Sequence, residues 1–173
     1  MRLPFISLTI GGVLLGQAAA LAATSSCVRP TERAALDVEG LKSELMVVAL
    51  DCDARDHYNA FVNRYKTALN TDEKQLGTYF SRAYGRRSKQ QDVYNTELAN
   101  GQSQAGTKQG TLFCQQHMPM FDEVMALRSD AELSEYAAGQ ELTEPVSAEE
   151  CATPEHATVR RVSSRHTVHS KHH

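Results

Sequence analysis

Residues 34–52 read AALDVEGLKSELMVVALDC, and the fold prediction depends mainly on this stretch. Leu41, Leu45, Val48 and Cys52 follow one another at spacings of four, three and four residues. Residues at these spacings lie on one face of an α-helix, because the helix completes a turn about every 3.6 residues. The stretch therefore predicts an amphipathic helix that turns Cys52 toward the protein core.

Apolar residues at helical spacing continue through most of the chain that follows. They predict further helices over residues 54–69, 71–84, 86–100, 111–127 and 130–138. Asp53 and Ser129 are expected to cap the helices that follow them, and Gly85 is expected to end the helix before it. Pro119 is expected to kink or break its helix, because proline lacks the N–H that a helix interior requires. No stretch alternates strictly enough for a sheet, so the predicted fold is all-α, a bundle of five or six helices.

Two stretches lack this pattern. Residues 100–110 read NGQSQAGTKQG, and their glycine, serine and glutamine content predicts a loop. The helix expected just before that loop is the weakest of the set, because it carries only Val93, Tyr94 and Leu98 as large apolar side chains. The helical pattern also ends at Gly139, which predicts irregular chain from there on.

Length and composition suggest one modest domain with extensions. The sequence has 173 residues, of which 41% are hydrophobic and 23% charged, and it contains no tryptophan. These values exclude a collagen-like, a low-complexity and a multi-pass membrane protein. We expect four segments, namely a signal peptide at 1–23, a helical domain at 24–138, an acidic linker with prolines at 139–155, and a basic, histidine-rich, disordered tail at 156–173.

Residues 1–23 read MRLPFISLTIGGVLLGQAAALAA and carry the features of a secretory signal peptide. Arg2 supplies the positive start, an apolar run follows, and Ala20 and Ala22 supply the small residues of a cleavage site before Ala23 or Thr24. The apolar run is broken by glycines and is shorter than the roughly 20 residues that span a bilayer, which disfavours a retained anchor. We therefore expect a periplasmic or secreted protein with no transmembrane segment after cleavage.

Export makes the cysteine count informative. The four cysteines are Cys27, Cys52, Cys114 and Cys151, an even number, and none lies in a C-x-x-C motif. A lipid-modified Cys27 is disfavoured, because no leucine stands three positions before it. Two structural disulfides are therefore expected, and four cysteines allow three pairings. We favour Cys52 with Cys114 and Cys27 with Cys151, because the first two lie within helical patterns and the others flank the domain, but the other two pairings remain open.

Charge is segregated along the chain. Residues 129–155 contain eight acidic residues and no lysine or arginine, whereas residues 156–173 contain four cations and no acidic residue. The net charge of the whole chain is −3; without Arg2 and the four cations of the tail, residues 24–155 have a net charge of −8. Such asymmetry is typical of a solvated extension or an interaction arm.

The stretch from Leu41 to Leu127 also carries a resemblance. Its segments LKSELMVVALDC, YNAFVNRY and FCQQ resemble those of small exported helical proteins of Gram-negative alphaproteobacteria, a group to which no activity is assigned. The resemblance covers about half of the chain and involves packing positions. It implies a periplasmic helical domain in which Cys52 and Cys114 are paired, and it implies no substrate, cofactor or catalytic residue.

The tail offers one candidate metal site. His166, His169, His172 and His173 form the pattern H-x-x-H-x-x-H-H. Neutral imidazole is a common ligand of zinc, nickel and copper, so a flexible segment with four histidines could wrap such an ion. The competing interpretation is a solvated basic tail, because the segment lacks the rigid framework that makes a metal site selective.

A second candidate combines soft ligands. Cys114, His117, Met118 and Met120 offer the thiolate, imidazole and thioether groups that Cu(I) prefers. Helical spacing explains them more simply as core positions, and a disulfide would remove the thiolate. On this interpretation His117 is a core histidine, substantially buried on a face with Cys114 and Phe121, and leucine is tolerated in its place.

An acid-base centre is the third candidate. His57 lies close in sequence to Asp53, Asp56 and Cys52, and the spacing of four residues allows a helical pair between Asp53 and His57. No motif places a serine or a free cysteine nucleophile beside it. An enzyme that uses His57 is therefore the weakest functional hypothesis.

A basic run is the fourth candidate. Residues 82–89 contain four cations, namely Arg82, Arg86, Arg87 and Lys89, and three aromatic residues lie nearby, namely Tyr79, Phe80 and Tyr84. Such a cluster could bind phosphate or single-stranded nucleic acid, but the acidic body argues against nucleic acid. An acidic partner or an anionic membrane surface would be attracted only modestly by so short a run.

These observations favour an exported, non-enzymatic binding or structural protein whose ligand is an unknown protein or envelope component. The alternative is a protein that binds or buffers divalent metal through its histidine-rich tail. No cofactor is expected for the helical domain itself.

Overall fold

The computed structural model describes residues 27–146 and 149–152 of the chain. The helices in this part are α2 (Pro30–Asp51), α3 (Arg55–Arg64), α4 (Lys66–Tyr84), α5 (Gln90–Gln109), α6 (Leu112–His117), α7 (Pro119–Ala126) and α8 (Asp130–Ala138). They make six helices when α6 and α7 are counted as one helix broken at Met118, so the all-α prediction is confirmed. The expected signal peptide and histidine-rich tail lie outside the described residues.

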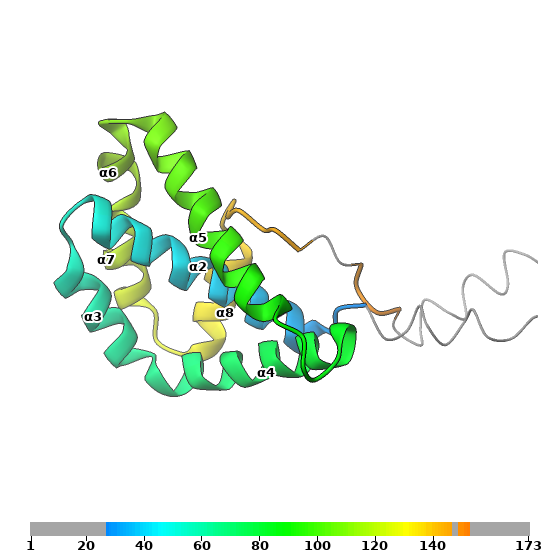
Figure 1. Ribbon diagram of the computed structural model, residues 1–173. Coiled ribbons are helices and arrows are strands. Elements are labelled where there is room, and N and C mark those ends of the chain that lie inside the picture. The colour runs from blue at the N-terminus through cyan, green and yellow to red at the C-terminus, as the bar shows by residue number, and fades with distance from the viewer. Residues whose placement is uncertain (1–26, 147–148, 153–173) are drawn as a thin grey trace, which may run out of the picture.

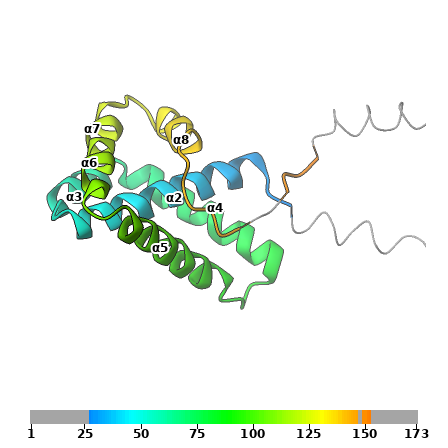
Figure 2. The same cartoon turned by 90° about the horizontal axis from the view of Figure 1, so that it is seen from above.

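Helix α2 forms the centre of the bundle, and the other helices pack around it (Figures 1 and 2). It contacts α4, α8, α5, α3 and α6. Pro30 begins the helix, where its missing N–H costs no hydrogen bond. Because partners lie on most of its sides, α2 also buries residues outside the predicted stripe, among them Leu36, Glu39 and Val47. The spacing of apolar residues therefore predicted only one of the faces that α2 buries.

Two hydrophobic clusters lie along α2. The cluster that we call the large core surrounds the C-terminal half of α2 and includes buried side chains from α3, α6, α7 and α8. The cluster that we call the small core joins the N-terminal half of α2 to α4 and α5, and its buried members are Val28, Ala35, Leu36, Leu76, Tyr79, Phe80, Tyr94 and Leu98. The two cores stabilise opposite ends of the bundle.

The junction between α3 and α4 lies at Tyr65, earlier than the predicted boundary near residue 70. Tyr65 is buried, and its hydroxyl donates a hydrogen bond to the carbonyl oxygen of Val124 at 2.7 Å. This contact joins residues far apart in sequence, so local spacing could not reveal it. The predicted cap at Asp53 is wrong, because Asp53 has a φ of 54° and Ala54 occupies the N-cap position without a side-chain hydrogen bond.

The predicted loop at residues 100–110 is also wrong, because α5 continues as a helix to Gln109. Gly106 lets this half of α5 approach α6 closely, since a Cβ atom there would lie 3.2 Å from the ring of Phe113. Gln102 is 1% exposed, and its side-chain amide donates to the carbonyl oxygen of Gly40 on α2 at 2.9 Å. Small and polar residues here serve close helix packing, and tertiary contacts override their low helix propensity.

Three local predictions are confirmed. Gly85 ends α4 with a φ of 91°, a conformation that favours glycine. The helix broken at Met118 resumes with Pro119 as the first residue of α7. The hydroxyl of Ser129 accepts a hydrogen bond from the N–H of Glu132 at 3.2 Å and so caps α8.

Candidate functional site

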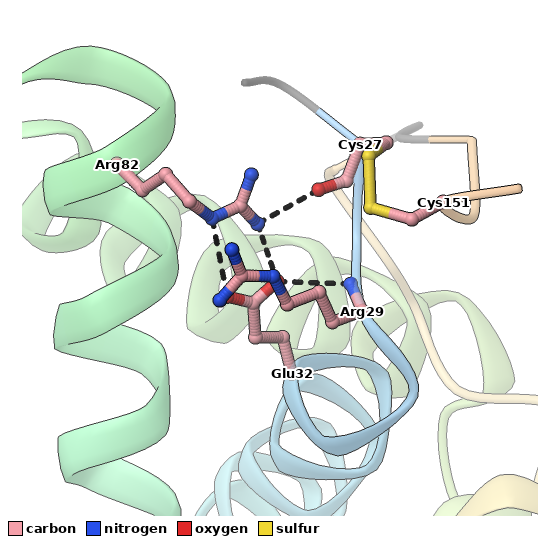
Figure 3. Close-up of a disulfide and its surroundings, with 5 residues drawn as sticks. All are labelled: Cys27, Arg29, Glu32, Arg82 and Cys151. Carbon is pink, nitrogen blue, oxygen red and sulfur yellow. Dashed lines mark hydrogen bonds and ion pairs between the residues drawn. A yellow bond between two sulfur atoms is a disulfide. The ribbon is translucent and has the colours of Figure 1, made fainter. Parts of the chain in front are cut away.

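The two ends of the described chain are joined at one end of the bundle (Figure 3). Cys27 forms a disulfide with Cys151, with 4.9 Å between their Cα atoms. Beside it, the N–H of Val28 donates to the carbonyl oxygen of Glu149 at 2.9 Å, and the N–H of Cys151 donates to the carbonyl oxygen of Val28 at 2.8 Å. We call this arrangement the terminal clasp. It confirms the favoured pairing of Cys27 with Cys151.

A buried ion pair connects the clasp to α4 (Figure 3). The Glu32 side chain is 1% exposed, and its carboxylate pairs with the guanidinium of Arg82. The same carboxylate accepts a hydrogen bond from the backbone N–H of Arg29 at 2.9 Å. Arg82 also donates to the carbonyl oxygen of Cys27 at 2.8 Å. One cation of the predicted basic run thus stabilises the fold.

The other cations of that run lie on the turn between α4 and α5. The three cations within residues 86–89 are exposed. Of the three aromatic residues expected to accompany them, Tyr79 and Phe80 are buried in the small core. Only Tyr84 reaches the surface, with 49% of the residue exposed. Sequence proximity therefore overstated the number of aromatic rings available to a ligand.

A shallow, open groove of about 550 Å³ runs along α4 toward this turn. The groove is lined by Lys74, Gly77, Thr78, Ser81, Arg82 and Arg86, and no acidic residue is among them. Lys74, Thr78 and Arg82 recur at intervals of four residues, which places them on one face of α4. The groove can therefore attract anions, although Arg82 is already paired with Glu32.

The second disulfide lies at the far end of α2. Cys52 is bonded to Cys114, with 5.6 Å between their Cα atoms, so the favoured pairing of these two cysteines is confirmed. Because Cys114 is in a disulfide, it offers no thiolate to a metal. The soft-ligand set of Cys114, His117, Met118 and Met120 therefore lacks its strongest ligand in this structure.

His117 lies in a polar contact that was not expected from the sequence. Its Nδ1 atom is 3.1 Å from Oε1 of Glu44, and its Nε2 atom is 3.2 Å from Oε1 of Gln109. The side chain is 25% exposed, so most of it is buried as expected. The ring packs on Phe113, with 4.5 Å between centroids, rather than on Phe121. Leucine at this position would remove both polar contacts.

Burial disfavours the charged forms of both partners in this contact. Glu44 is 6% exposed, and burial raises the pKa of its carboxyl because the carboxylate loses hydration. Burial lowers the pKa of the His117 imidazole for the same reason. Glu44 could have been suspected from its position two helical turns before Cys52, but Gln109 lay in the stretch predicted to be a loop.

His57, the residue of the third candidate, does not form an acid-base pair with Asp53. It is exposed on α3, and its ring lies 5.5 Å from that of Phe121. Asp53 precedes the helix with a left-handed backbone, and the helical pair that the spacing allows between Asp53 and His57 does not form within the described residues.

A small cavity of about 190 Å³ lies between α2, the end of α8 and the segment that follows it. Its lining residues are Arg33, Leu36, Asp37, Gly40, Ala137, Ala138, Gln140, Leu142, Thr143 and Glu144. Burial raises the pKa of Asp37 and of Glu144, and the Arg33 guanidinium counteracts this shift at both carboxyls. The charges lining the cavity therefore offset one another in part.

The metal ligands predicted in the tail, His166, His169, His172 and His173, lie outside the described residues. Within residues 27–146 and 149–152, no group of three or more histidine, cysteine, aspartate or glutamate side chains is arranged to bind a metal ion. In the same part of the chain, no helix has the length and apolar character needed to cross a membrane.

Neither a scan of protein-family models nor comparisons with curated proteins and solved structures gave a match. The function must therefore be inferred from the disulfides, charges and surfaces of this chain.

Proposed function

We propose that the protein is exported to the periplasm or secreted, and that it acts by binding a partner or an envelope component without catalysing a reaction. The observation that carries the proposal is that Cys27, Cys52, Cys114 and Cys151 are all engaged in disulfides. Disulfides persist in oxidising compartments and are rare in the cytosol. The signal-peptide features of residues 1–23 support the same compartment.

The surroundings of the reactive side chains support a binding role. Cys114, three residues before His117, is bonded to Cys52 and so offers no thiolate nucleophile. His117 contacts the carboxylate of Glu44 and the side-chain amide of Gln109, so both of its ring nitrogens already have partners within the fold. The basic turn after α4 is exposed, so a partner can reach its cations.

Export is tested by expressing the full chain, with its own first residues, in a Gram-negative host. We expect protein in the periplasm or medium, an N-terminus at Ala23 or Thr24 by mass spectrometry, and no thiol that reacts before reduction. A matched control with Ala20→Leu, Ala22→Leu and Ala23→Leu should remain uncleaved. Recovery of the uncleaved, reduced wild-type chain from the cytosol would contradict the proposal.

Metal binding by the tail is the second candidate, and the spacing of its four histidines favours it. At about pH 7.5 the full chain should bind zinc or nickel more tightly than a chain that ends at residue 155. The difference should shrink at about pH 5.5, because protons compete for the same ring nitrogens. Equal affinities at the higher pH would eliminate this candidate.

A further inference from the structure

The turn between α4 and α5 is positively charged on a body that is negatively charged. We call residues 84–93 the cationic turn. It contains Arg86, Arg87 and Lys89 and one acidic residue, Asp92, whereas residues 24–155 as a whole have a net charge of −8. Within the described residues none of the three cations forms an ion pair. Their charge is therefore directed to the solvent.

Two exposed apolar residues flank these cations. Tyr84 at the end of α4 is 49% exposed, and Val93 in the first turns of α5 is 42% exposed. The Tyr84 ring stacks on the buried Phe80 ring, with 5.9 Å between centroids, so its position is fixed by the small core. An aromatic side chain with a polar tip, placed beside cations, is typical of residues at a membrane–water interface.

The terminal clasp holds Cys27 and Cys151 at the same end of the bundle as the last turn of α4. Arg82, in the last turn of α4, donates to the carbonyl oxygen of Cys27, and Cys27 is bonded to Cys151 (Figure 3). Cys151 is therefore held close to the end of α4. In the sequence, residues 156–173 contain four further cations.

From these features we propose that the cationic turn contacts the anionic lipid headgroups of an envelope membrane. This proposal rests on the proposed export of the chain. The cations of the turn are attracted to anionic headgroups, and each cation near such a surface strengthens binding about fivefold. Charge complementarity therefore favours an anionic surface as the partner. The exposed pair of Tyr84 and Val93 selects a bilayer over a soluble polyanion, because a bilayer interface accepts an aliphatic side chain as well as an aromatic one.

The test measures co-sedimentation of the chain from Thr24 to His173 with lipid vesicles at about pH 7.5, where the reference pKa of histidine keeps most of the tail imidazoles neutral. Binding is expected for vesicles of phosphatidylglycerol and phosphatidylcholine and not for phosphatidylcholine alone, and it should weaken as salt is added. Replacing both Arg86 and Arg87 with serine should weaken binding about 25-fold.

Control variants separate the cationic turn from net charge and from the general surface. Arg55→Ser with Lys108→Ser removes two exposed cations from other parts of the bundle, and it should change the affinity less than about threefold because of screening. Tyr84→Ser should weaken binding severalfold. Leu112→Ser removes a side chain of similar exposure on α6 and should have no effect. Unchanged circular dichroism and melting temperature show that each variant is folded.

Several results would overturn the proposal. The Arg86 and Arg87 variant could bind vesicles as the wild type does, or a chain ending at residue 155 could lose all binding while the turn variant loses none. Tighter binding to a single-stranded oligonucleotide than to the anionic vesicles, at the same salt, would assign the surface to a soluble polyanion. If the chain fails to bind vesicles, the proposed export still stands, because export is tested separately. If the export test fails, the chain can still bind vesicles in the assay, but it would not meet an envelope membrane in the cell.

Discussion

The two ends of the bundle each carry a disulfide, but they stabilise their helices differently. At the Cys52 end, the bridge to Cys114 packs against the large core, which combines apolar side chains from five helices. At the Cys27 end, the small core is supplemented by the terminal clasp and by the buried pair of Glu32 and Arg82. The comparison indicates that the Cys52 bridge is supported by apolar packing from several helices, whereas the Cys27 bridge joins two chain ends that are held mainly by polar contacts.

The largest effect is expected from removing the bridge at the Cys52 end. The two bridges restrict the unfolded chain to a similar extent, because Cys52–Cys114 spans 62 residues and lies inside the 124 spanned by Cys27–Cys151. Chain entropy then assigns each about 4 kcal/mol, a model-dependent figure. When the Cys27–Cys151 bridge is lost, the chain ends at the clasp can fray in the folded protein. The folded state then gains conformational entropy as well, so the free energy of unfolding falls by less than chain entropy alone assigns to this bridge.

Chemical denaturation of two double variants measures the difference. Cys52→Ala with Cys114→Ala should lower the free energy of unfolding by about 4 kcal/mol. Cys27→Ala with Cys151→Ala should lower it clearly less, and hydrogen exchange should increase locally around Val28. Equal losses from the two variants would contradict the distinction between the ends.

The polar contacts at the clasp are tested by Arg82→Ala. This change leaves the carboxylate of Glu32, which is 1% exposed, without its cation, and should cost about 3 kcal/mol of stability. Arg86→Ala is the matched control, because Arg86 is exposed and forms no ion pair within the described residues; it should change stability by less than about 0.5 kcal/mol. If both variants lose equally little, the ion pair does not stabilise this end.

Local sequence patterns predicted the helices that bury one clear apolar stripe. They failed where contacts between residues far apart in the sequence determine where a helix begins or ends. The Ser129 cap and the break before Pro119 depend on neighbouring residues, so both were predictable. The turn at Tyr65 depends on a hydrogen bond to Val124, and the second half of α5 depends on its packing against α2 and α6. Such contacts have no signature in the spacing of apolar residues.

The candidate sites show the same division. The cysteine pairs were predicted from their number and placement, and both are confirmed. The basic run was recognised as a cluster, but the sequence could not show that Arg82 is paired with Glu32, fifty residues earlier in the chain, while Arg86 stays exposed. Arg82 is partly buried and forms an ion pair, whereas Arg86 is exposed to solvent. This difference depends on how the helices pack, which the local sequence does not show.

Close packing at the Cys52 end is tested at Gly106. A larger side chain there would collide with the ring of Phe113 in the large core, so Gly106→Leu should destabilise the protein by about 2 kcal/mol in denaturant melts. Gly77 is also inside a helix, but a Cβ atom there would meet its nearest neighbour, Gln91, at a comfortable 3.7 Å. Gly77→Ala should therefore stabilise by about 0.5 to 1 kcal/mol through the entropy of the unfolded chain. A stabilising Gly106→Leu would show that α5 and α6 are not closely packed.

The smallest effect is a pH dependence at the same end. Burial raises the pKa of Glu44 above its ordinary value of 4.5, so the folded chain binds this proton more tightly than the unfolded chain. The stability that this group contributes is fully present below about pH 4.5 and is lost as the pH rises through the raised pKa. Glu44→Gln removes the titration but keeps an oxygen that can accept a hydrogen bond from His117. The stability of Glu44→Gln relative to the wild type should therefore increase from about pH 4.5 upward and then level off.

His117 provides the opposing titration, which separates the two partners. Burial lowers its pKa below the ordinary value of 6.5, so the wild type should lose stability as the pH falls from about 6.5 through the lowered pKa. His117→Gln, which can still donate to Glu44, should not show this loss, whereas Glu44→Gln should retain it. Free energies of unfolding measured between about pH 4 and 8 for both variants and the wild type distinguish the two slopes. Parallel curves for all three proteins would mean that neither group titrates differently in the folded chain, and the polar contact at the Cys52 end would then be a surface feature rather than a buried one.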